Sequence, residues 1–166
     1  IVEPQRNFRD MADHSAGELV GWSPKLRAAL NAKYEFVHPE HSEIRGLSHI
    51  EWTGRPTQAG AHARNAVFYG DKAIDRSPCG TGTSARLAAK FARGELAVGE
   101  MFVHESMIGS LFRCGIRGTT TVAGMPAVLP TIAGRAWITA FHDFVVEDDD
   151  PFPVGFRVGD IWGPGA

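Results

Sequence analysis

The stretch "DRSPCGTGTSARLAAKFARGEL" (residues 75–96) decides the fold, because a glycine-rich turn leads there directly into a helix. The helical part, "SARLAAKFARG" (84–94), has four alanines beside a leucine and a phenylalanine, and Gly94 is expected to close it. A helix that is apolar over so wide an arc must be enclosed, and small side chains let strands approach closely. Its charged positions, expected to form a solvated edge, are Arg86, Lys90 and Arg93.

Periodicity and turn residues predict further elements on both sides of this helix. The segment "SPKLRAALNAKYEF" predicts a helix with Ser23 as N-cap and Pro24 at its first position. Strands are expected at 43–54, 63–70, 100–106, 110–118, 119–130 and 135–147. A helix, two strands, a second helix and about four strands predict an α+β fold, with a mostly antiparallel sheet curled around the second helix.

Composition excludes several classes of protein. The 166 residues are 43% hydrophobic and 22% charged, which is ordinary for a globular chain. A net charge of −2 offers no footprint for nucleic acid, and no apolar run is long enough to span a membrane. Two cysteines cannot form a disulfide framework, so a reducing cytoplasm is expected. The chain begins "IVEP" without Met, which predicts missing upstream residues.

The position of Cys79 suggests chemistry rather than packing. Its sulfur should lie near the amides of Gly80 and Thr81 at the positive end of the helix. Such a site binds carboxylates, and the same field is expected to lower the thiol pKa toward neutrality. Asp75 offers a carboxylate to a ligand cation. A carboxylate receptor, an ammonium partner and a sulfur that takes and gives a proton together suit an α-amino acid.

Two other interpretations of Cys79 stay open from the residues alone. It could be an inert buried cysteine, or a nucleophile paired with one of the seven histidines, although no spacing selects one. Cys114 lies in a strand-like run and is interpreted as a core residue. No metal site is predicted, because "HPEH" (38–41) lacks a further ligand and "VEDDDP" (146–151) is typical of a solvated turn.

The undecapeptide "DRSPCGTGTSA" resembles the signature around the second catalytic cysteine of the proline racemase family, which includes 4-hydroxyproline epimerases. The resemblance extends from about residue 38 onward. It includes the stretches "HPEHSEIRGLSHIEWTG", "FVHESMIGSLF", "TIAGRAWITAF" and "DPFPVGF".

The resemblance implies a racemase or epimerase that uses no cofactor and works with two cysteines, one on each side of the substrate Cα. Cys79 would be one of these acid/base groups, and Asp75 would hold the substrate amine. Gly80 and Thr81 would donate amides to the substrate carboxylate, and His49 would contact the substrate. A cysteine here argues against the related 3-hydroxyproline dehydratases, which have threonine, and His49 favours 4-hydroxyproline over proline.

The family fold is a pair of diaminopimelate-epimerase-like domains, with the active site between them. Family members are about twice this length, and the "CGH"- or "CGT"-like motif of their first cysteine does not occur here. Residues 1–143 are therefore expected to form the second domain, and residues 144–166 a tail returning to the missing first domain. Alone, the chain is expected to be inactive, and a homodimer is left open.

A second hypothesis comes from a different functional class. The chain could be a non-catalytic half-domain that binds an amino acid carboxylate or pairs with another chain. An upstream cysteine followed by Gly and by His or Thr would favour the enzyme. A native product that starts near Ile1 without a partner chain would favour the binding module.

Overall fold

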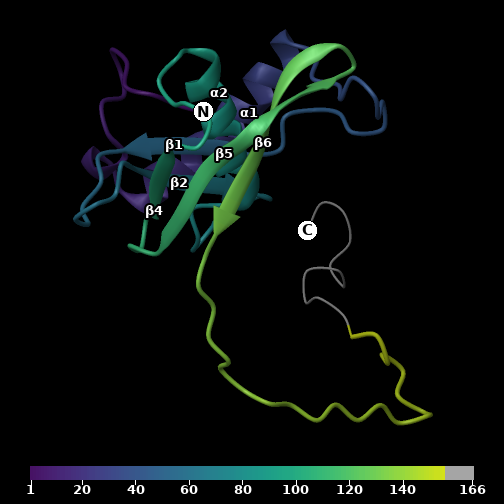
Figure 1. Cartoon of the computed structure of the whole chain (residues 1–166). Helices are drawn as coiled ribbons and strands as arrows, with labels where there is room; N and C mark the ends of the chain where they lie inside the picture. Colours follow the sequence, from purple (N-terminus) through teal and green to yellow (C-terminus); the bar gives the residue numbers. More distant parts are fainter. Residues whose placement is uncertain (156–166) are drawn as a thin grey trace. The chain divides into compact units, whose positions relative to one another are not determined.

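The computed structural model describes residues 1–155, and the chain divides into two compact units, 1–135 and 136–166 (Figure 1). The helices and strands of the described part all lie in the first unit. In chain order they are η1 (Met11–Asp13), α1 (Ala16–Lys33), β1 (Ile50–Gly54), β2 (Ala63–Tyr69), β3 (Ala73–Ile74), α2 (Gly80–Ala92), β4 (Met101–Ser106), β5 (Leu111–Val122) and β6 (Met125–Ala133). No helix of the described residues is long and apolar enough to cross a membrane.

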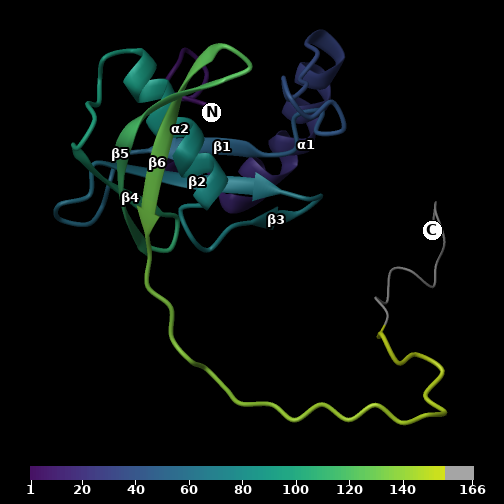
Figure 2. The same ribbon diagram turned by 45° about the vertical axis from the view of Figure 1, so that its right-hand side comes forward.

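The strands form one sheet in the order β1-β2-β4-β5-β6, and the short β3 pairs with β2. Only β2 and β4 are parallel, because α2 carries the chain back across the sheet between them, and the other neighbours are antiparallel. The predicted α+β class with a mostly antiparallel sheet is thus confirmed. Figure 2 shows the long twisted hairpin of β5 and β6 beside α2, and these two elements are in contact.

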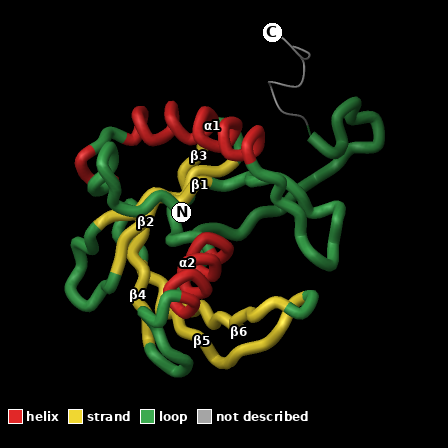
Figure 3. Tube along the Cα trace, turned by 90° about the horizontal axis from the view of Figure 1, so that it is seen from above, coloured by secondary structure: helices red, strands yellow, loops and turns green. Residues whose placement is uncertain are grey.

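Two hydrophobic clusters lie on opposite faces of the sheet. Seen from above, α1 and α2 are separated by β1 and β2 (Figure 3). The cluster on the α1 side includes Leu19, Trp52 and Phe68, and the cluster on the α2 side is centred on Leu87, which is fully buried. β2 is buried on both faces because a helix covers each of them, and five of its seven residues are buried.

The helix α1 begins at Ala16, so the prediction of Ser23 as its N-cap is wrong. Ser15 is the N-cap, and a capping box joins its side chain and backbone to those of Glu18. Ser23 lies inside the helix, where its hydroxyl donates to the carbonyl of Leu19 and accepts from Trp52 Nε1. The polar side chain at position 23 thus binds the helix to β1 instead of starting the helix.

The helix α2 also begins earlier than the predicted residue 84, at Gly80, because Cys79 itself caps it. Gly94 follows the last turn at a φ of 71°, as expected of a glycine that ends a helix. The prediction that the charged stripe is solvated is wrong for Arg86, which is only 8% exposed. The helix is therefore charged on the side that faces the sheet.

Strand boundaries follow the hydrophobic pattern unevenly. The prediction for 63–70 agrees with β2, whereas only Ile50–Gly54 of the predicted 43–54 is a strand. The predicted break at residue 118 is wrong: β5 continues to Val122 and turns at Ala123–Gly124, where both residues have positive φ. Such a two-residue turn matches the twist of a hairpin.

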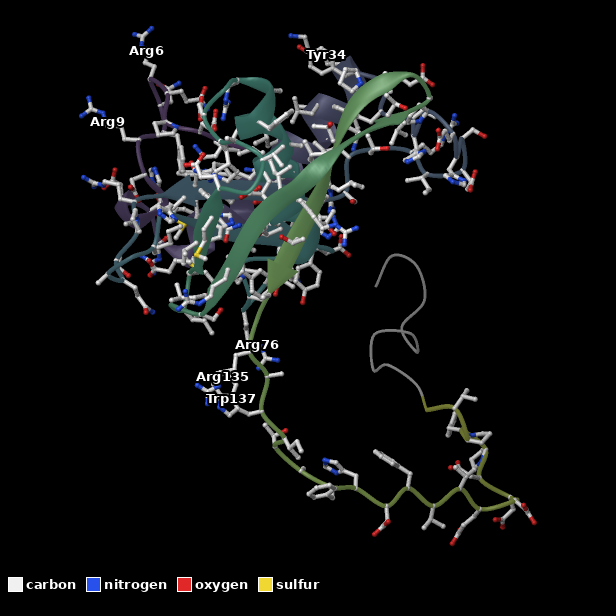
Figure 4. All side chains as sticks on the ribbon, in the orientation of Figure 1. Arg6, Arg9, Tyr34, Arg76, Arg135 and Trp137 are labelled. Atoms are coloured by element: carbon white, nitrogen blue, oxygen red, sulfur yellow. The ribbon has the colours of Figure 1, made fainter. Side chains whose placement is uncertain are left out.

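The strand predicted for 135–147 is wrong. Residues 136–155 contain no strand or helix, and Figure 4 shows their side chains along an extended trace. Several large apolar side chains are exposed in this unit, namely Trp137, Ile138, Phe141, Phe144, Val145, Val146, Phe152 and Val154. An apolar pattern becomes a strand only against a pairing edge, and residues 136–155 by themselves provide none. Residues 156–166 of the predicted tail lie outside the described residues.

Candidate active site

Cys79 is the N-cap of α2 and is 8% exposed. Its Sγ accepts a hydrogen bond from the Gly82 amide at 3.4 Å, and its own amide donates to Ser77 Oγ at 3.1 Å. Gly82 allows a close approach here, because a Cβ at this position would lie 3.1 Å from Val67 Cγ2 of β2 and the valine would have to shift. The sequence thus brings the start of the helix, and the sulfur with it, close to the sheet.

The electrostatic surroundings of the Cys79 thiol differ from the prediction. Burial raises the pKa of Cys79 above its ordinary value, and the carboxylates of Asp75 and Glu51 raise it further. The amides of Gly82 and Thr81 oppose this by bonding to the sulfur, and they do not prevail. The expected lowering of the thiol pKa toward neutrality is therefore wrong, because desolvation and two acidic neighbours outweigh the helix end.

Three of the other predicted site residues lie in the same short segment as Cys79. Asp75 follows β3, is half-buried, and uses Oδ1 to accept bonds from the amide and the hydroxyl of Ser77, both at 3.0 Å. Gly80 and Thr81 are exposed in the first turn of α2, where amides have no partner within the helix. The segment therefore presents a carboxylate, a sulfur and helix amides over seven residues.

His49 reaches the same region from a different part of the chain. It is exposed just before β1, its Nδ1 lies 2.7 Å from Ser48 Oγ, and its ring stacks on Tyr69. A cavity of about 240 Å³ is lined by His49 together with Thr81 and Gly82 of α2. The structure thus brings the predicted histidine to the beginning of the helix that Cys79 caps.

A buried charged group that no sequence pattern predicted lies under α2. Glu51 Oε1 lies 3.8 Å from both Arg86 Nη1 and His104 Nε2, and it accepts a 3.0 Å hydrogen bond from Asn65 Nδ2. Burial raises the pKa of Glu51 and lowers that of His104 to about 3, so the imidazole is neutral at ordinary pH. The signal that could have revealed the group is the presence of ionisable residues, Glu51 and His104, inside the predicted strands 43–54 and 100–106.

Cys114 differs from Cys79 in every respect except burial. It lies on β5 in the hydrophobic cluster that contains Leu87 and Phe102, and burial alone raises its pKa to about 11. Its interpretation as a core residue is confirmed. Within residues 1–155, no group of three His, Cys, Asp or Glu side chains is arranged to hold a metal ion.

Comparison with known proteins identifies the family. The family model described as proline racemase matches residues 1–157, so the chain belongs to the proline racemase family. The resemblance seen around Cys79 is thereby confirmed.

Two curated relatives are similar over nearly the whole chain. A protein of Rhizobium meliloti named "Probable 4-hydroxyproline 2-epimerase" is 70% identical over 95% of this chain and 47% of its own length. The 4-hydroxyproline 2-epimerase of Paracoccus denitrificans is 67% identical over 95% of this chain and 48% of its own length. The chain therefore spans about half the length of the curated relatives it matches.

The fold is similar to that of solved epimerase structures. A hydroxyproline epimerase of Agrobacterium vitis, crystallised with trans-4-hydroxy-L-proline, superposes with a TM-score of 0.76 at 36% identity. The superposition covers 94% of this chain and 46% of that chain. The relatives named for this activity are isomerases, and the chain matches about half of each.

Proposed function

We propose that this chain is one half of a 4-hydroxyproline 2-epimerase that uses two cysteines and no cofactor, with Cys79 as one of the two proton-transfer groups. The observation that carries the proposal is the placement of Cys79 Sγ at the beginning of α2, 3.4 Å from the Gly82 amide and between carboxylates. The names of the relatives support 4-hydroxyproline as substrate. Proline is the alternative substrate.

The proposed reaction moves one proton off the substrate and another proton on. In one direction the Cys79 thiolate removes the α-proton, so that a C–H bond breaks and an S–H bond forms. The electron pair is left on Cα and its carboxylate, and the thiol of the second cysteine delivers a proton to the opposite face. In the other direction Cys79 is the thiol that donates. The reaction is balanced without an oxidant or a metal.

The surrounding groups have separate tasks in this proposal. The amides of Gly80 and Thr81 at the beginning of α2 receive the substrate carboxylate and stabilise the charge that develops on it, as helix N-termini do for anions. Asp75 holds the ammonium of the imino acid, and His49 lines the cavity that would take the ring substituent. These assignments are supported by the position of Asp75, Gly80 and Thr81 in the same seven-residue segment as Cys79, and by the cavity that His49 and Thr81 share.

The positive charge of the substrate would offset part of the rise in the Cys79 pKa. The Asp75 carboxylate raises the pKa of Cys79 by charge repulsion. A substrate ammonium paired with Asp75 would cancel much of that repulsion, so binding would favour the thiolate. The proton-transfer group would then become ionised mainly when substrate is present, which limits side reactions of a free thiolate.

The architecture of the whole enzyme is part of the proposal. Residues 1–143 would be the second of two similar domains, each with a sheet wrapped around a central helix. The tail 144–166 would return to the first domain, which would supply the other cysteine and complete the site. The exposed apolar side chains in 136–155 support a partner surface of this kind. A cytoplasmic location and a homodimer remain predictions.

A second candidate function is a binding module without catalysis. The raised pKa of Cys79 favours it, because a thiol that stays protonated transfers protons poorly. Such a module would still hold a carboxylate at the beginning of α2. It would bind an imino acid without exchanging the α-proton for solvent deuterium.

The deciding experiment is polarimetry on the full-length gene product, with trans-4-hydroxy-L-proline and L-proline assayed side by side. The proposal expects the optical rotation of trans-4-hydroxy-L-proline to change as its Cα is inverted. If proline were the substrate instead, its rotation would fall to zero. Residues 1–166 alone should show no turnover. Proton exchange at Cα, followed by NMR in deuterated water, separates the two functions. Binding without any exchange would overturn the enzyme proposal in favour of the binding module.

A further inference from the structure

The carbonyl of Pro78, the residue before the proposed catalytic cysteine, accepts hydrogen bonds from two buried side chains. Asn65 Nδ2 donates to it at 2.8 Å from β2, and Thr83 Oγ1 donates at 3.0 Å from the first turn of α2. Both side chains belong to residues with no exposed surface. The carbonyl therefore has two donors supplied by two different elements, which fixes its direction.

This carbonyl belongs to the same peptide plane as the amide of Cys79. On its other side, the plane is fixed by the hydrogen bond from the Cys79 amide to Ser77 Oγ. Cys79 itself has φ 64° and ψ 123°, a region that residues other than glycine rarely occupy. Such a backbone conformation is strained and persists only where the surroundings over-determine it. Asn65, Thr83 and Ser77 provide that determination.

The hydroxyl of Thr83 is in turn oriented by His104. Its single hydrogen is used on Pro78, so in the 3.0 Å contact with His104 Nδ1 the imidazole must be the donor. Because burial keeps His104 neutral, the hydrogen on Nδ1 leaves Nε2 bare. Nε2 faces Glu51 Oε1 at 3.8 Å, and Glu51 Oε1 accepts from Asn65. Among the described residues His104 Nε2 itself has no hydrogen-bond partner, so the two branches that start at Pro78 end separately, one at His104 and one at Glu51.

We propose that Asn65 and Thr83 are positioning residues, which hold the Pro78–Cys79 peptide so that Cys79 Sγ stays against the Gly82 amide and faces the substrate. Neither residue touches the substrate in this proposal. It rests on the proposed role of Cys79 in proton transfer. Glu51 and His104 act one step further away, by fixing the two donors.

The first test replaces the Thr83 hydroxyl in the full-length enzyme. Thr83→Val keeps the shape of the side chain, and we expect kcat to fall about 100-fold with KM changed less than about threefold, as for a misplaced catalytic group. Thr83→Ser restores the hydroxyl and should recover kcat to within about threefold of wild type. The matched control is Thr131→Val on β6, which removes a hydroxyl bonded to the Gly115 carbonyl at 3.3 Å and should leave both constants unchanged.

A purely structural role for Thr83 predicts a different pattern. Thr83→Val would then lower the melting temperature and the active fraction, without a split between kcat and KM and without rescue by serine. Wild-type kcat in folded Thr83→Val would overturn the proposal. If circular dichroism shows that Thr83→Val does not fold, Thr83→Ala removes the same hydroxyl without adding a methyl group and carries the same expectation.

A second readout needs no substrate, so it separates this proposal from the proposed function. The rate of Cys79 alkylation by iodoacetamide is followed against pH by peptide mass spectrometry, with Cys114 as internal reference. Loss of the hydrogen bond from Thr83 to the Pro78 carbonyl should move Sγ away from the Gly82 amide. The pH midpoint of Cys79 alkylation should therefore rise in Thr83→Val and be unchanged in Thr131→Val. An unchanged or lower midpoint would overturn the proposal. Absence of turnover in the wild type, with the midpoint shifted, would overturn only the proposed function.

Discussion

The two cysteines of this chain are almost equally buried, at 8% and 5% exposure, yet their surroundings are opposite. Cys79 caps a helix, accepts an amide hydrogen bond and has two carboxylates nearby. Cys114 lies within a strand among apolar side chains, with burial as the single influence on its pKa. Burial by itself therefore does not distinguish a reactive thiol from an inert one. The distinction lies in the donors and charges that burial brings close to the sulfur.

The comparison also shows why the helix end did not lower the Cys79 pKa. Burial disfavours the Cys79 thiolate most, and the carboxylates of Asp75 and Glu51 add to this, whereas a helix N-terminus contributes only roughly half a positive charge. The pKa of Cys79 therefore depends on charged neighbours whose effect a ligand cation could offset. The pKa of Cys114 depends on burial, and no charged neighbour in the described part of the chain contributes to its shift.

The largest expected effect is the difference in kcat between variants of the full-length enzyme in which one or the other cysteine is replaced. Cys79→Ser should lower kcat by about 1,000-fold, because a hydroxyl is a far weaker acid and base than a thiol at neutral pH. Cys114→Ala should leave kcat within about threefold, since it removes only a small buried group. Steady-state polarimetry measures both. Equal losses in the two variants would contradict the distinction drawn between them.

The next effect tests the charge balance at Cys79. Asp75→Asn should raise KM by about 10- to 100-fold, because the substrate ammonium loses its charged partner. It should also lower the pKa of Cys79, because a carboxylate that raises that pKa is removed. The matched control is Asp71→Asn on the exposed Asp71–Arg27 ion pair, where Asp71 is 95% exposed, and KM should not change. A normal KM in Asp75→Asn would remove Asp75 from the substrate site.

A smaller effect concerns alkylation of the wild-type thiols. At pH 8.5 iodoacetamide should label Cys79 at least about tenfold faster than Cys114, because the thiolate is the nucleophile. Burial raises the pKa of Cys114 to about 11, whereas the sulfur of Cys79 accepts an amide hydrogen bond from Gly82 that favours the thiolate. Peptide mass spectrometry gives both rates from one sample. Equal rates would mean that the amides at the helix end have no effect on the sulfur.

The smallest expected effect is the pH dependence of stability that His104 causes. This histidine contacts Thr83, near Cys79, and the ring of Phe102, which lies in the same hydrophobic cluster as Cys114. The pKa of His104 is about 3 in the folded state and near 6.5 when unfolded. As pH falls below 6.5, only the unfolded state binds this proton, so stability is lost, by about 1 kcal/mol at pH 5.5.

The measurement for His104 is the free energy of unfolding against pH, in urea, for wild type and His104→Gln. Glu51 contributes in the opposite sense, because its raised pKa lets the folded state take up a proton as pH falls. The difference between wild type and variant isolates the histidine. A difference that does not change between pH 7.5 and 5.5 would show that His104 is not kept neutral.

Much of the candidate site could be predicted from local sequence. Asp75, Cys79, Gly80 and Thr81 lie within seven residues, so the chain itself holds them together whatever the rest of the fold does. The start of α1 was equally available, because Ser15 and Glu18 form a capping box with a recognisable spacing. It was missed because Ser23–Pro24 gave a competing signal for a helix start.

Other features could not be predicted, because they depend on residues far apart in the chain. The hydrogen bonds that link Glu51, Asn65, Thr83 and His104 to Pro78 combine the three neighbouring strands β1, β2 and β4 with the helix α2. The exposure of Ile138 and Phe141 depends on whether their segment pairs with the edge of a sheet, and the hydrophobic pattern along the chain does not show this. Hydrophobic periodicity shows which face of a helix or strand is buried, but it does not show which other element packs against that face.

The family, the α+β class and the segment in which a cysteine meets a helix N-terminus could all be predicted from the chain alone, since each depends on neighbours along it. The direction in which the Cys79 pKa shifts and the burial of Arg86 against Glu51 became evident only in the folded structure. The physical reason is that desolvation and Coulomb interactions depend on distances through space, and those distances exist only once the sheet and the helix have packed.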